Sequence, residues 1–134
     1  MLPILFMTPK ASELVVESLE ATRVVGAPDA LDAAALRGGS LILRLAADDA
    51  LVIEGSIEVN DPSAIILPDT GWVALRKDER TLRETLLSVC SFELRAGLNQ
   101  GMVAGLPAKV WLDGENSMVI VAAAFGAELE ERLG

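Results

Sequence analysis

Side chains that can act as bases, nucleophiles or metal ligands are few in this sequence. It has no histidine and no tyrosine, and it carries one cysteine, Cys90, and three lysines, Lys10, Lys77 and Lys109. Without histidine, Ser-His-Asp and Cys-His triads and zinc sites with imidazole ligands are excluded. A single cysteine also excludes a disulfide bond within the chain.

The remaining candidates fit structural roles better than catalytic ones. Cys90 falls on the apolar side of a predicted helix near its carboxyl end, where the helix dipole disfavours a thiolate, so we interpret it as a buried structural residue. The acidic pair Asp48-Asp49 and the acidic segment 113–116 lie in predicted turns, and the segment lacks the spaced carboxylates of a calcium loop. The glycines match no phosphate-binding pattern. We therefore predict no catalytic residue and no metal ligand.

Length and composition indicate one folded domain. A chain of 134 residues has the size of one domain, and its 51% hydrophobic content argues against disorder. The net charge of −9 disfavours nucleic-acid binding, because phosphates would be repelled. The apolar segment 1–7 is too short to span a bilayer and no basic residue precedes it, so we expect a cytoplasmic protein with no membrane segment. We predict a single domain over 1–134, in which residues 1–25 form a first strand plus a flexible or interface-forming tail.

The hydrophobic pattern predicts the same order of elements, β-α-β-β, twice along the chain. The first copy comprises a strand ending near residue 25, a helix over 28–36 and a hairpin of strands 41–45 and 51–53. The second copy comprises a strand over 72–76, a helix opening at 77 and a hairpin of strands 108–112 and 118–121. Asp78 suits the N-cap of the second helix, and one face of that helix carries Leu82, Leu86, Val89 and Cys90.

The other elements complete an α+β fold. Strands 64–67 and 72–76 flank a turn at 68–71, which predicts a further hairpin, and 57–59 is a short strand. We predict a polar loop over 95–100, turns within 101–107 and a helix over 125–133. Because hairpins rather than helical crossovers join the strands, the prediction is an antiparallel sheet or sheets, built from two β-α-β-β units with a C-terminal helix.

Strand 72–76 ends in Leu75-Arg76 and precedes a leucine-rich helix and then the segment Val89-Cys90-Ser91-Phe92-Glu93-Leu94. This order resembles the strand, helix and Cys-Pro-Leu-Asp-Leu order of the gamma subunit family of heterotetrameric sarcosine oxidase. Segment 45–53 is similar to a Leu-Gly-Pro-Asp-Glu-Trp-Leu-Leu segment of the family. The segment 106–114 is similar to its Val-Pro-Val-Leu-Leu-Trp strand, and 125–129 to its Ser-Phe-Ala-x-x-Leu helix.

The resemblance implies both a fold and a role. The implied fold is that of aminomethyltransferase folate-binding domains and of the N-terminal domain of the related tRNA-modifying GTPase. In sarcosine oxidase the gamma subunit is non-catalytic, and flavins, NAD and folate are held by other subunits. The resemblance therefore implies a chain that binds other proteins and no cofactor of its own.

Three functional hypotheses follow. The first is a non-catalytic, protein-binding subunit like the sarcosine oxidase gamma subunit, whose interface candidates are Leu5, Phe6, Trp72 and Trp111, because interface cores are rich in aromatic and apolar side chains.

The two alternatives make different use of the same fold. One is an aminomethyltransferase-like module that binds folate or a related one-carbon carrier, with Asp61 or Asp69 directed at the pterin ring. The other is a self-associating, ferredoxin-like α+β domain. The partners expected overall are protein chains or further copies of this chain, and neither nucleic acid nor membrane.

Overall fold

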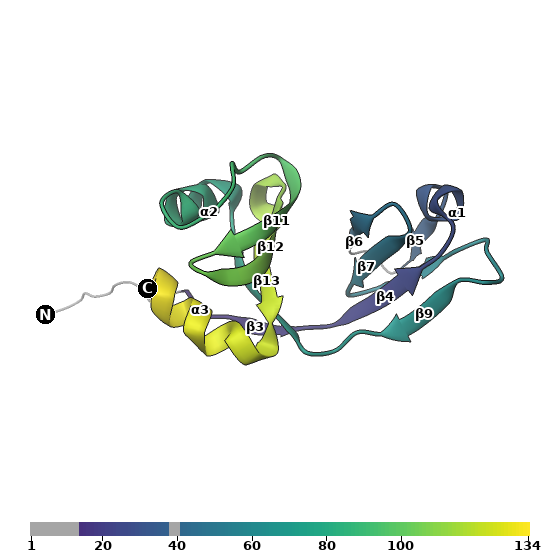
Figure 1. Cartoon of the computed structure of the whole chain (residues 1–134), viewed down its shortest axis with the longest axis horizontal. Helices are drawn as coiled ribbons and strands as arrows, with labels where there is room; N and C mark the ends of the chain where they lie inside the picture. Colours follow the sequence, from purple (N-terminus) through teal and green to yellow (C-terminus); the bar gives the residue numbers. More distant parts are fainter. Residues whose placement is uncertain (1–13, 38–40) are drawn as a thin grey trace, which may run out of the picture. The chain divides into compact units, whose positions relative to one another are not determined.

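The computed structural model of the chain describes residues 14–37 and 41–134. These residues gather into two compact units, one made of residues up to Ser18 together with Val73–Gly134, and one of Leu19–Trp72 (Figure 1). Each unit has a hydrophobic core of its own. Leu5, Phe6 and most of the predicted N-terminal tail lie outside the described residues, and the single domain over 1–134 stays a prediction.

The unit Leu19–Trp72 is built on a four-stranded sheet. Its strand order is β6-β7-β4-β9, and each neighbouring pair is antiparallel. The elements of this unit, in chain order, are β4 (Ala21–Val25), α1 (Pro28–Asp32), β5 (Ala35–Arg37), β6 (Leu41–Ala46), β7 (Asp49–Ile53), β8 (Ser56–Glu58) and β9 (Ile65–Pro68). Buried Val24, Ala50 and Val52 pack with Leu31 of α1. The predicted strand, helix and hairpin order is therefore confirmed here.

The predicted helix over 28–36 is correct only in its first half. It begins at Pro28 with Asp29 in its first turn, as predicted, but it ends at Asp32. The following residues form β5, which pairs with β8 in a separate two-stranded antiparallel sheet. A ladder of backbone hydrogen bonds to residues distant in sequence outweighs the local helix propensity of this alanine-rich segment.

The predicted hairpin of 64–67 with 72–76 is wrong, although both strands exist. β9 pairs with β4, whereas β10 (Trp72–Lys77) belongs to another sheet. The Asp69 N–H donates to the Ala21 carbonyl at 2.9 Å, so the chain stays paired with β4 beyond the end of β9. Pairing with β4 satisfies the backbone groups that a hairpin would otherwise have satisfied.

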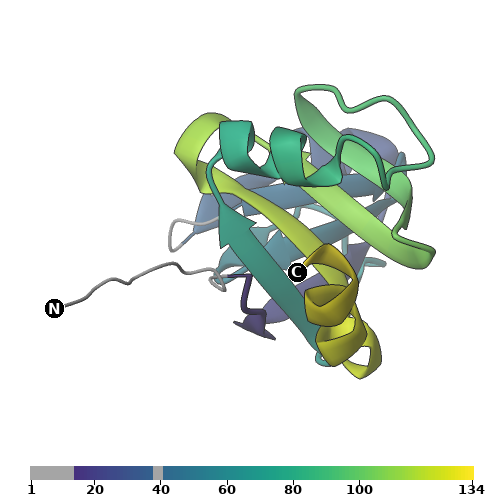
Figure 2. The same ribbon diagram turned by 90° about the vertical axis from the view of Figure 1, so that its left-hand side faces the viewer.

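The other unit is built on a five-stranded sheet with the order β11-β12-β13-β10-β3. Besides β10, its elements are β3 (Glu17–Leu19), α2 (Glu79–Leu86), β11 (Gly97–Val103), β12 (Leu106–Leu112), η1 (Gly114–Asn116), β13 (Ser117–Ala122), η2 (Ala123–Phe125) and α3 (Gly126–Leu133). Every second residue of β12 is buried, and these residues pack with Leu82 and Leu86 of α2 and Leu129 of α3. Figure 2 shows both helices on the same side of this sheet. The α+β class with antiparallel sheets and a C-terminal helix is confirmed.

The helix α2 begins as predicted and ends earlier. The Asp78 carboxylate accepts a hydrogen bond from the Thr81 N–H at 2.7 Å, which confirms the N-cap. The helix stops at Leu86, so Val89 and Cys90 follow it rather than sharing its face. Cys90 instead forms an isolated antiparallel bridge with Val103 at the end of β11.

The predicted polar loop over 95–100 is wrong, because β11 already begins at Gly97. Asn99 is the reason that a polar segment can enter the sheet. It is only 8% exposed, and its side-chain amide donates to the carbonyls of Arg95, Gly97 and Val110 while its oxygen accepts from the Arg95 N–H. A buried polar side chain costs little when its hydrogen-bonding groups are satisfied, so composition alone misled the prediction.

A two-residue turn joins β11 and β12, where turns were predicted. Val103 pairs with Leu106, which leaves Ala104 and Gly105 at the tip, both with positive φ. Such turns favour Asn-Gly because both positions need the left-handed region. Ala104 has a φ of 52°, a conformation that is unfavourable for alanine.

Replacing Ala104 with asparagine should therefore stabilise this unit. We expect Ala104→Asn to raise the free energy of unfolding by about 0.5–1 kcal/mol, measured by urea unfolding. Gly105→Ala is the control and should lower the free energy of unfolding. A Cβ there would lie 3.0 Å from the Arg132 guanidinium, and the residue has a φ of +81°. Equal or lower stability of Ala104→Asn would contradict the strain assigned to this turn.

Candidate functional site

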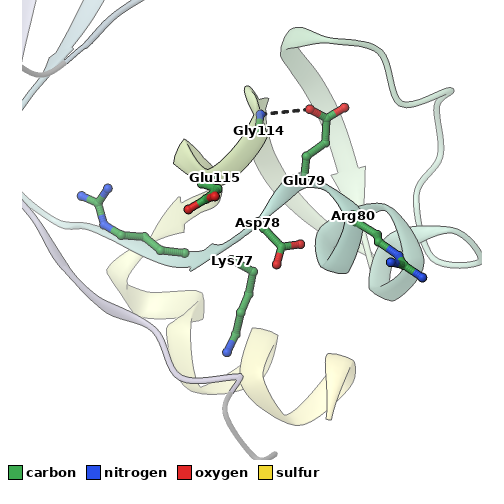
Figure 3. A pocket seen from close by; sticks show the side chains of 7 residues that line it. Lys77, Asp78, Glu79, Arg80, Gly114 and Glu115 are labelled. Carbon is green, nitrogen blue, oxygen red and sulfur yellow. Dashed lines mark hydrogen bonds between the residues drawn. The ribbon is translucent and has the colours of Figure 1, made fainter.

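A hollow lies where α2 begins, beside η1 (Figure 3). Its volume is about 720 Å³, and it is lined by Arg76, Lys77, Asp78, Glu79, Arg80, Gly114 and Glu115. Side chains of both charges surround it, and in Figure 3 Lys77 and Arg80 point in different directions. The cations therefore do not converge on one point, as they would around a bound phosphate.

The two acids at the start of α2, Asp78 and Glu79, accept hydrogen bonds from groups of the same unit. The Glu79 carboxylate accepts from the Gly114 N–H at 3.0 Å, the bond drawn in Figure 3, and from Nε of Arg83 at 2.8 Å. The bond from Gly114, and to a smaller extent the bond from Arg83, lowers the pKa of Glu79. The bond from the Thr81 N–H lowers the pKa of Asp78. A general base near neutral pH needs a raised carboxylate pKa, so these two groups suit structure rather than proton transfer.

Cys90 lines a smaller and more apolar hollow of about 330 Å³. The hollow is also lined by Arg83, Leu87, Phe92, Glu93 and Leu94. The thiol is half-buried against the core, where burial raises the pKa of Cys90. A raised pKa leaves less thiolate at neutral pH, which is the opposite of activation. The predicted structural role therefore fits, although the residue is half-buried rather than fully buried.

The folate candidates Asp61 and Asp69 lie at opposite ends of the β4–β9 pair. The Asp61 carboxylate accepts from the backbone N–H groups of Ala27 and Ser63, both at 2.9 Å, and these bonds lower the pKa of Asp61. Asp69 follows the other end of β9 and faces Arg23 at 3.3 Å. The structure thus does not bring the two acids into one site, and binding of folate by either stays a prediction.

Arg23 joins β4, β7 and the residue after β9 through carboxylates. Its Nε and Nη2 donate to the two oxygens of Asp49 at 2.5 and 2.6 Å, and Nη1 donates to Asp69. The bonds to Asp49 raise the pKa of Arg23 further above its already high ordinary value. A bidentate arginine–carboxylate pair fixes geometry as well as charge, so this group ties β4 to β7 and to the residue after β9.

The predicted interface tryptophans both lie in strands. Trp72 opens β10 and Trp111 lies in β12 opposite Leu98 and Met118, and each side chain is half-buried. Partial exposure suits packing inside the fold and packing against a partner equally, so their interface role stays a prediction.

A feature that the sequence predictions did not single out is the exposed apolar edge strand β9. Ile65, Ile66 and Leu67 are 56%, 51% and 58% exposed, and β9 is the last strand of its sheet. The signal was present in the sequence, because three consecutive large apolar residues place apolar groups on both faces of a strand. A strand whose two faces were both covered within the fold would have the same pattern, so only the structure identifies this one as exposed.

The described part of the chain holds neither a cluster of metal ligands nor a membrane-spanning helix. Within residues 14–37 and 41–134, no three acidic or cysteine side chains are grouped to hold a metal ion. No helix in the same two ranges is long and apolar enough to cross a membrane.

Comparison with known proteins gives a fold relationship. No family model matches the sequence, and no curated protein matches it. The chain is similar in structure to a chain of the heterotetrameric sarcosine oxidase from Corynebacterium sp. U-96, solved in complex with pyrrole 2-carboxylate. The TM-score is 0.68 at 14% identity, and the match covers 91% of this chain and 86% of that one. The likeness shows a shared fold, and the two similar coverages mean that the matched chain is close to this one in length.

The lowered pKa of Glu79 predicts an acid-dependent contribution to stability. Because its folded pKa lies below its unfolded pKa, the contribution is present above the unfolded value of about 4.3 and is lost as the pH falls through the folded pKa. Glu79→Gln should therefore unfold in less urea than the parent chain at pH 7, with the difference shrinking in acid. Glu84→Gln is the matched control, because Glu84 pairs with Arg80 only at 3.6 Å and in an exposed position. A difference that grows as the pH falls would contradict the assignment.

The raised pKa of Cys90 predicts slow alkylation. We expect iodoacetamide to modify the native chain at pH 8 at least about threefold more slowly than the urea-unfolded chain, because burial reduces both the thiolate fraction and access. Mass spectrometry measures the single adduct over time. The alkylation rate of glutathione with and without urea is the control for the effect of urea on the reagent. If the native and unfolded chains reacted at the same rate, the Cys90 thiol would be neither shielded from the reagent nor raised in pKa.

Proposed function

We propose that this chain is a non-catalytic, protein-binding subunit of an oxidase complex that resembles heterotetrameric sarcosine oxidase, in the role of its gamma subunit. The observation that carries the proposal is the fold likeness over 91% of the chain to a chain of that heterotetramer. The match spans most of both chains, so the likeness concerns a whole small subunit rather than a fragment of a large one. The residue patterns described above point to the same family independently of the coordinates.

The chemistry of the side chains supports an accessory role. The sequence offers no imidazole, and its one thiol has a raised pKa. The acids Asp61, Asp78 and Glu79 have lowered pKa values because they accept hydrogen bonds from the backbone. Charged groups bound in this way stabilise the fold. In the proposed complex the flavin and the amine substrate would be held by the other subunits, as the resemblance implies.

Exposed apolar surface supports binding to a protein. The apolar residues of β9 are more than half exposed along a whole strand, and this is surface that a partner chain would remove from water. Burial of apolar area is the main favourable contribution to association of proteins.

The proposal is tested by purifying the chain from its source cells with an affinity tag on the chromosomal gene. We expect native mass spectrometry to show this chain in a complex of fixed stoichiometry with larger chains. The complex should show a flavin absorption spectrum and should consume oxygen with a secondary amine such as sarcosine. Cys90→Ser should leave this oxidation unchanged, because no catalytic role is assigned to the thiol.

Other results would favour the alternatives. A stable monomer from the same lysate, with no co-purifying chain, would contradict the proposal. A complex of identical copies would support the self-associating domain. Heat released on titration of the isolated chain with folate, lost in Asp61→Asn or Asp69→Asn, would support the one-carbon carrier module.

A further inference from the structure

Among the described residues, β9 pairs on one side only, and the register identifies which backbone groups lie on its other side. The Asp69 N–H donates to the Ala21 carbonyl, so positions 69 and 21 form a hydrogen-bonded pair. In an antiparallel ladder such pairs alternate, so Leu67 and Ile65 also direct their backbone groups towards β4. The N–H and carbonyl of Ile66 and the carbonyl of Pro68 therefore point away from β4. No described strand pairs with this side.

The bonds on the other side of β4 confirm this alternation. The Glu54 N–H donates to the Glu20 carbonyl, and the Gly26 N–H donates to the Asp48 carbonyl. Even-numbered positions of β4 therefore bond towards β7, and odd-numbered positions bond towards β9. The free edge of β9 is thus centred on Ile66, and Pro68, which has no N–H, limits the ladder in one direction.

The side chains of β9 make this edge apolar on both faces of the sheet. Ile66 lies across from Val24, a core residue, and Ile65 and Leu67 lie on the opposite face across from Val25 and Arg23. All three β9 residues are more than half exposed. Edge strands of proteins that act alone usually carry lysine or other charges that discourage pairing, and these three positions carry none.

The charge of this unit indicates what kind of strand would bind. Residues 19–72 contain nine acidic side chains and three arginines, a net charge of −6. Two of the three, Arg23 and Arg44, already pair with Asp49 and Asp32. A second copy would bring the same negative charge to the edge and would be repelled, whereas a basic segment would be attracted.

A hollow of about 260 Å³ lies at the Pro68 end of β9. It is lined by Thr22, Pro68 and Thr70 and by two exposed acids, Glu20 and Glu54. Oxygen atoms of carboxylates and hydroxyls around a small opening suit an ammonium or guanidinium group. The hollow thus offers a place for one basic side chain of a segment that runs along β9 and continues past its Pro68 end.

We propose that the free edge of β9 binds an extended apolar segment of a partner chain as an added antiparallel strand, with a lysine or arginine of that segment in the hollow between Glu20 and Glu54. The inference rests on the proposed function, and it specifies the surface and the chemistry of the partner. Backbone bonds to Ile66 would set the register, and burial of Ile65, Ile66 and Leu67 would supply most of the affinity.

The test compares hydrogen exchange in the isolated chain and in the native complex. In the isolated chain the Ile66 amide should exchange faster than the Leu67 amide, which bonds β4. In the complex the Ile66 amide should be slowed at least about tenfold, because its N–H gains a partner. An intact complex in which the Ile66 amide stays as fast as in the isolated chain would overturn the inference while leaving the proposed function standing.

Variants at one position separate backbone pairing from general packing. Ile66→Pro removes the outward N–H, keeps an apolar side chain and fixes φ, so it should weaken partner binding at least about tenfold. Ile66→Val is the matched control and should change the dissociation constant less than about threefold. Ile66→Lys keeps the N–H and should also weaken binding through repulsion of the basic segment, which preserves the test if the proline variant misfolds. Wild-type affinity of Ile66→Lys would overturn the inference.

The acidic hollow has its own test. Glu20→Gln combined with Glu54→Gln should weaken binding about threefold to tenfold and reduce its dependence on salt, because one desolvated ion pair is lost. A photo-crosslinker at Ile66 should then join the complex to an apolar segment that carries a lysine or arginine. A crosslink between two copies of this chain would overturn the partner assignment, and the absence of any complex would instead contradict the proposed function.

Discussion

The sheet of residues 19–72 depends on β4, which forms backbone bonds on both of its sides. The Glu20 carbonyl and the Gly26 N–H, which flank β4, bond the β7 side, and the Ala21 carbonyl within β4 accepts from the N–H of the residue after β9. A central strand must alternate in this way, because successive backbone groups of an extended chain point in opposite directions. The same alternation gives β9 one side bonded to β4 and one side with which no strand of residues 14–37 or 41–134 pairs. The proposed docking edge is therefore a consequence of the central position of β4.

The order of strand, helix and hairpin occurs in both units, and the first strand takes the same position in each sheet. β4 lies beside β7, and β10 lies beside β13, so in each case the first strand neighbours the second strand of the hairpin that follows the helix. The reason is general, since the outer side of a hairpin offers a row of unpaired backbone groups that the earlier strand can satisfy. The second unit adds β11 before its hairpin, which its satisfied Asn99 allows.

Several charged side chains of this acidic protein connect its elements. Glu79 links α2 to η1, Asp61 accepts from Ala27 and Ser63, and Arg23 bridges two aspartates. Side chains bound in this way have little freedom to act on a substrate. Together with the fold likeness to a chain of a heterotetrameric oxidase, this arrangement fits the proposed accessory role, in which the exposed apolar strand rather than a polar pocket carries the function.

The sequence by itself determined the fold class, the positions of most strands, the Asp78 cap and the lack of imidazole chemistry, because these depend on local patterns and composition. The tertiary structure alone decided which strands pair. The segment 35–37 became a strand, β9 joined β4 instead of a hairpin, and Asn99 entered a sheet. Each of these depends on hydrogen bonds between residues far apart in the chain. For the same reason the sequence predicted a strand at β9 but only the fold made it an exposed edge.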